Sequence, residues 1–118
     1  MKFEISLSGS DVEAILCALP LVTELDTSTP HQAAVNAALC ASASKKLSSG
    51  AIHLTPNEIR VVSVALNAAV LLLSGQCPEF FDGIDKEWKS ILSPYFFSLN
   101  KLDGAFQRIL EQSGFLPE

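Results

Sequence analysis

Histidine and cysteine are the residues of this 118-residue chain that could bind a metal or act as a catalytic base or nucleophile, and both types are few. The histidines are His31 and His53, and the cysteines are Cys17, Cys40 and Cys77. Zinc sites hold such residues at close, repeated spacing, and a nucleophilic cysteine needs a nearby base. No local spacing in this chain favours either arrangement. We therefore expect no metal site, no cofactor and no catalytic residue, and free thiols in a reducing, cytoplasmic compartment.

The segment of residues 77–97, CPEFFDGIDKEWKSILSPYFF, brings carboxylates and aromatic side chains together. Asp82, Asp85 and Glu87 lack the ligand register of a calcium loop, so metal binding there is a weak interpretation. The aromatic residues are more informative. Three in succession, residues 95–97, spread over roughly 200° of a helix with 3.6 residues per turn. A helix packed on one side cannot bury all three.

Aromatic side chains ringed by polar groups are typical of the buried centre of protein interfaces. The residues predicted to bind a partner are Phe80, Phe81, Asp82, Trp88, Tyr95 and Phe97. The plainer interpretation, that a small domain encloses these aromatic rings in its core, stays open at this stage. The functional hypothesis is a non-enzymatic protein-interaction or regulatory domain that acts through an apolar and acidic aromatic surface. The alternative is a small-molecule-binding or enzymatic helical domain with an aromatic-lined pocket, in which Asn67 or Tyr95 supplies a polar group.

Composition narrows the classes of partner. Only 18% of the residues are charged, whereas 48% are hydrophobic, and the net charge is −5. Nucleic-acid binding usually requires clustered lysine and arginine, and no basic run exceeds Lys45-Lys46. The same acidity disfavours anionic membrane surfaces, and the most apolar stretch, residues 61–73, is shorter than the roughly 20 residues that span a bilayer. Hydrophobic residues in excess of one small core favour a homodimer.

Local patterns predict the elements that position these residues. Alternation over residues 2–7 predicts a strand, and Ser8 then precedes a helix that Pro20 should kink or end. The sequence T-P-H-Q at residues 29–32 predicts a capped helix that continues to about Gly50. Residues 51–54 form a second strand candidate, and T-P-N-E at residues 55–58 begins a largely apolar helix that reaches about Ser74. Two further helices are expected, after Asp85 and after Ser93-Pro94.

The stretch from Ile5 to Leu19 resembles the stretch from Ile52 to Leu66 at an offset of 47 residues. Two explanations stand: a duplicated unit, or two independent strand-to-helix connections with the same capping chemistry. In either case we expect the repeated stretch to form scaffold without an active site.

Together these patterns predict one domain over residues 1–118, mainly α with a minor β component. It would contain about five helices and a short two-stranded antiparallel ribbon of residues 2–7 and 51–54. Two related strand-helix-helix halves are one arrangement that agrees with this pattern, and two unrelated strand-to-helix connections are the other.

Overall fold

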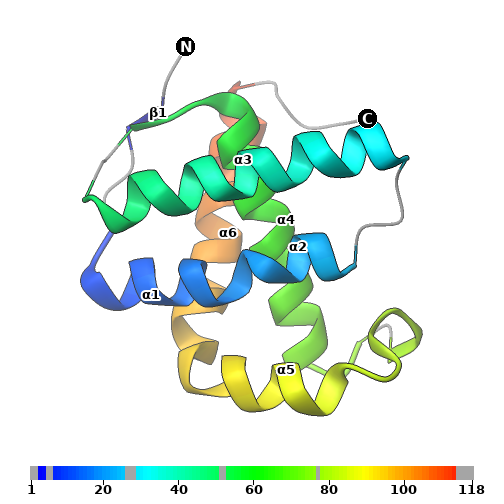
Figure 1. Ribbon diagram of the computed structural model, residues 1–118. Coiled ribbons are helices and arrows are strands. Elements are labelled where there is room, and N and C mark those ends of the chain that lie inside the picture. Colours follow the sequence, from blue (N-terminus) through cyan, green and yellow to red (C-terminus); the bar gives the residue numbers. More distant parts are fainter. Residues whose placement is uncertain (1–2, 5–6, 26–28, 51–52, 77, 114–118) are drawn as a thin grey trace.

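The computed structural model describes residues 3–4, 7–25, 29–50, 53–76 and 78–113. These residues are mostly helical, as predicted (Figure 1). The elements in chain order are β1 (Phe3–Glu4), α1 (Gly9–Ala18), α2 (Pro20–Glu24), α3 (Pro30–Ser48), β2 (His53–Leu54), α4 (Pro56–Leu73), the 3-10 helix η1 (Pro78–Phe81), α5 (Asp85–Leu92), the 3-10 helix η2 (Ser93–Tyr95) and α6 (Phe96–Ser113).

Three capping threonine and serine residues begin α1, α3 and α4, as the sequence predicts. Ser8 and Thr55 each accept a hydrogen bond from the backbone of the third helical residue, and the acidic side chain of that residue bonds back to the cap. Thr29 accepts from the Gln32 backbone in the same way. The side-chain amide of Gln32 donates to Asn36 one turn further on.

Proline divides the first helical stretch. Pro20 has no amide hydrogen and its ring crowds the preceding turn. As a result α1 ends at Ala18 and α2 begins at Pro20, although the two short helices follow one another in nearly one line (Figure 1). This break contributes to a total of six α-helices in the described residues, where about five were predicted.

The strands are short where the structure describes them. β1 and β2 pair antiparallel, with Phe3 opposite Leu54 and Glu4 opposite His53. Residues 2, 5–6 and 51–52 lie outside the described residues, and Leu7 belongs to the connection that leads into α1. The full ribbon of residues 2–7 and 51–54 and the relation between two halves therefore stay predictions.

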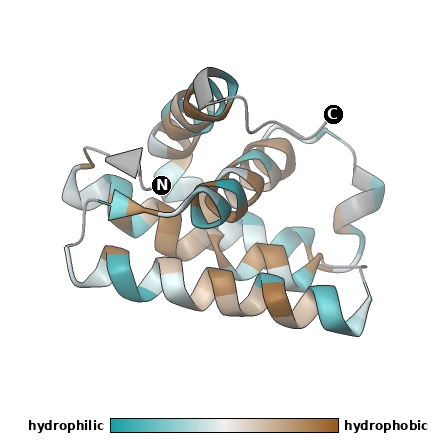
Figure 2. Cartoon of the chain, turned by 90° about the horizontal axis from the view of Figure 1, so that it is seen from above, coloured by the Kyte–Doolittle hydropathy of each residue, from teal (hydrophilic) through white to brown (hydrophobic). Residues whose placement is uncertain are grey.

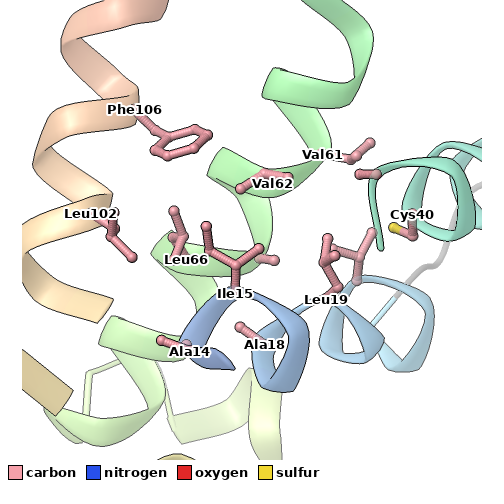
Figure 3. Packing of buried hydrophobic residues seen from close by; sticks show 14 of the residues in the cluster. Ala14, Ile15, Ala18, Leu19, Cys40, Val61, Val62, Leu66, Leu102 and Phe106 are labelled. Atoms are coloured by element: carbon pink, nitrogen blue, oxygen red, sulfur yellow. The ribbon is translucent and has the colours of Figure 1, made fainter. Parts of the chain in front are cut away.

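Helix α4 is the centre of the core. It contacts α1, α2, α3, α5 and α6, and its residues Leu66 and Val62 are fully buried. Side chains from three helices converge there: Ile15 of α1 and Phe106 of α6 point toward these α4 residues (Figure 3). The long helices carry both hydrophobic and hydrophilic residues, as amphipathic core helices do (Figure 2).

By length and composition alone, α4 could also cross a membrane, because its 18 residues have a mean hydropathy of 1.4. Half of that window is buried inside the fold. Its central position is sufficient to account for its apolar composition.

Candidate functional site

The residues predicted to bind a partner are distributed between the core and the surface. Phe81 is 3% exposed and belongs to the interior, so its predicted place on a surface was wrong. It ends η1, and the turn that follows directs the chain away while the ring stays inside. Asp82, the next residue, is exposed. The side chain of Phe80 lies outside the described residues.

Trp88 and Tyr95 are half-buried and pack against the hydrophobic core. The hydroxyl of Tyr95 faces Cys17 of α1. The electrostatic interaction and the hydrogen bond of this hydroxyl with Cys17, together with the charge of Glu13, raise the pKa of Tyr95. Tyr95 therefore stays protonated near neutral pH and links η2 to α1.

Phe97 is the most exposed large hydrophobic residue described, at 88%. Its neighbour Phe96 is 37% exposed and Ile91, near the end of α5, is 42% exposed. The rings of Phe96 and Phe97 meet edge to face, with centroids 6.0 Å apart. The prediction that one helix cannot bury residues 95–97 together is confirmed. We call the two paired rings, Phe96 and Phe97, the aromatic surface. Ile91 is a further exposed apolar side chain that precedes them in the sequence.

Sequence reasoning had not included Ile91 and Phe96 in the candidate surface. The spacing of the apolar residues in α6 could have indicated that Phe96 is exposed. Its inward positions are Leu99, Leu102 and Phe106, all buried. Position 97 falls on the opposite side of that stripe at 100° per residue, and position 96 falls at its border. Exposure of these rings therefore follows from the direction in which α6 packs.

The repeated stretches place two acidic side chains in the interior. Glu58 is 1% exposed and accepts hydrogen bonds from Lys46 Nζ at 2.7 Å, Ser42 Oγ at 2.5 Å and the Thr55 backbone at 2.8 Å. Burial by itself would raise the pKa of Glu58, but these hydrogen bonds lower it to about 2. The carboxylate is therefore ionised at neutral pH and accepts three hydrogen bonds. Two of these come from α3, so Glu58 connects α3 to the start of α4.

Asp11 is the third residue of α1, as Glu58 is the third residue of α4. It is 4% exposed, and its Oδ2 accepts from the Ser8 backbone at 3.1 Å. The ammonium of Lys101 lies 3.1 Å from Oδ1, in a direction that gives this oxygen no hydrogen bond. Burial opposes ionisation of Asp11, whereas the bonds from Ser8 and Lys101 lower its pKa. Both repeats thus use the third helical residue as a cap and as a partner for a distant lysine.

These geometries favour scaffold over catalysis at the acidic groups. A general acid or base near neutral pH needs a pKa close to that pH, and the hydrogen bonds hold both carboxylates ionised. Among the residues that the structure describes, no three His, Cys, Asp or Glu side chains lie together as a metal site would require. Cys17 is half-buried and Cys40 is buried, and Cys77 lies outside the described residues.

Comparisons with protein-family models, with curated proteins and with solved structures gave no match.

Proposed function

We propose that this chain is a non-enzymatic protein-interaction domain that acts through the aromatic surface. The single observation that carries the proposal is the 88% exposure of Phe97. Transfer of a phenylalanine side chain from water to an apolar contact is worth about 1.5–3 kcal/mol. In protein interfaces a few aromatic side chains supply most of the binding energy. The exposed ring of Phe97, paired with that of Phe96, is a side chain of this kind.

The remaining chemistry supports the same choice. The two buried carboxylates are engaged in caps and ion pairs, and the hydroxyl of Tyr95 is hydrogen-bonded to Cys17. Asp82 and Glu87 are exposed and precede the exposed apolar residues in the sequence, so they are the acidic groups that this proposal includes beside the aromatic surface. We keep homodimerisation in the cytoplasm as a further proposal, on the strength of the low charge content. Light scattering across high micromolar concentrations tests it, and a strict monomer would count against the dimer.

Site-specific photo-cross-linking tests the interaction function. The residue p-benzoyl-phenylalanine replaces Phe97 in the full chain, in the cell that naturally makes it. Covalent protein adducts are expected at Phe97. The matched control places the same residue at Ser48, which is exposed on α3. Adducts of equal amount at both positions, or at neither, would refute a specific role for the aromatic surface.

A further inference from the structure

The outer face of α6 carries a second feature that begins at Phe97. Phe97, Lys101, Gly104 and Arg108 succeed one another at intervals of four, three and four residues, which places them along one stripe of the helix. Lys101 has a side chain that is 64% exposed, and Arg108 is also exposed. The buried residues of α6 lie on the opposite side.

Gly104 lies in this stripe, although packing inside the protein does not require glycine at this position. Glycine inside a helix costs about 1 kcal/mol relative to alanine. A Cβ atom at Gly104 would meet only the Arg108 guanidinium at 3.6 Å, which is an ordinary contact. Packing inside the protein therefore does not demand glycine here. On the outer side, the guanidinium of Arg108 lies against the position that a side chain at residue 104 would occupy. A larger residue there would displace this guanidinium from the helix.

The charge of the stripe differs from that of the whole protein. The chain has a net charge of −5, yet the exposed charges beside Phe97 and Gly104 are the cations Lys101 and Arg108. Lys101 also contacts the buried Asp11, and most of its side chain remains open to solvent. Asp103 lies on another side of α6 and accepts a hydrogen bond from Gln107. Glu111 follows at the far end of the stripe.

We propose that this stripe of α6 binds an acidic amphipathic helix of a partner protein. An apolar side chain of that helix packs on Phe97, and carboxylates on its flank pair with the exposed part of Lys101 and with Arg108, which lies over Gly104. Charge complementarity selects this occupant, because a basic helix would meet the exposed cation of Arg108, beside the ammonium of Lys101 that is already paired with Asp11. The inference rests on the proposed interaction function and adds the chemistry of the partner.

Two synthetic helices of about 18 residues test this chemistry. They share one leucine-rich face and differ only in the flanking residues, which are glutamate in one peptide and lysine in the other. Fluorescence anisotropy of the labelled peptides measures binding to the full chain. The glutamate-flanked helix is expected to bind at least about tenfold more tightly at low salt, and salt should weaken it.

Variants of the stripe locate the binding. Arg108→Glu is expected to weaken the glutamate-flanked helix at least about tenfold by charge reversal. Gly104→Leu, a substitution to a good helix former, should weaken binding while the melting temperature is maintained. The control Lys45→Glu changes an exposed lysine on α3 and should leave affinity unchanged.

Three results would overturn the inference: equal affinity for the two peptides, no binding of the glutamate-flanked peptide, or unchanged affinity in Arg108→Glu and Gly104→Leu. A wild-type dimer that Phe97→Lys dissociates would identify a second copy as the occupant and would also overturn it. In each case, photo-cross-linking at Phe97 tests the proposed interaction function separately. Specific adducts would support that function even where the acidic helix is refuted as the partner.

Discussion

Replacing Lys46 by methionine removes the cation that faces the buried carboxylate of Glu58. The Nζ–Oε1 distance is 2.7 Å, and the side chains of Lys46 and Glu58 are 34% and 2% exposed. Methionine keeps most of the aliphatic length of lysine and so preserves the packing of its stem along α3. The substitution therefore tests the charge more than the volume.

The expected size of the effect follows from the lowered pKa of Glu58. A change from 4.5 to about 2 corresponds to about 3 kcal/mol in favour of the ionised form in the folded protein. Lys46 supplies part of this, and Ser42 and Thr55 keep their hydrogen bonds after the substitution. We expect Lys46→Met to reduce the free energy of unfolding by about 2 kcal/mol at pH 7.

The pH dependence gives a second and sharper test. Because folding lowers the pKa of Glu58, its contribution is complete above pH 4.5 and is lost as the pH falls toward 2. Without Lys46 the folded-state pKa rises, and the variant can relieve the buried charge by protonation at a higher pH. The stability difference between wild type and variant should therefore shrink between neutral pH and about pH 3.

Urea denaturation followed by the fluorescence of the single tryptophan, Trp88, measures both quantities. Lys45→Met is the matched control, since Lys45 is exposed on the same helix and its loss should cost no more than about 0.5 kcal/mol. Equal effects of the two substitutions at pH 7 would show that the Lys46–Glu58 pair contributes no more than a solvent-exposed pair. A penalty that stays constant with pH would refute the assignment to Glu58.

Three further outcomes are expected. Leu66→Asp should abolish the folded helical signal in circular dichroism, because it places an unpaired charge at a fully buried position of α4; a near-normal melting curve would mean that the core is centred elsewhere. Thr55→Ala should reduce the free energy of unfolding by about 1 kcal/mol through loss of the α4 cap, and no change in urea denaturation would contradict that role. Gly104→Ala should increase the melting temperature, in keeping with about 1 kcal/mol of helix propensity, and a decrease would reveal an internal requirement for glycine.

The sequence by itself determined the features that depend on neighbours a few residues away. Ser8 and Thr55 begin their helices because a cap and the backbone amide three residues later form a contact that needs no other part of the chain. Pro20 divides a helix for an equally local reason. The three aromatic residues at positions 95–97 exceed what one face of a helix can bury, whichever way that helix packs.

Only the tertiary structure decided which distant groups meet and which side chains remain outside. Lys101 reaches Asp11 across 90 positions of sequence, and Lys46 and Ser42 reach Glu58 only because α3 lies against α4. No capping pattern contains that information. Phe81 is enclosed while Phe97 is exposed for the same kind of reason, since the sequence shows that both rings are apolar but the direction in which η1 and α6 pack determines which one faces the core.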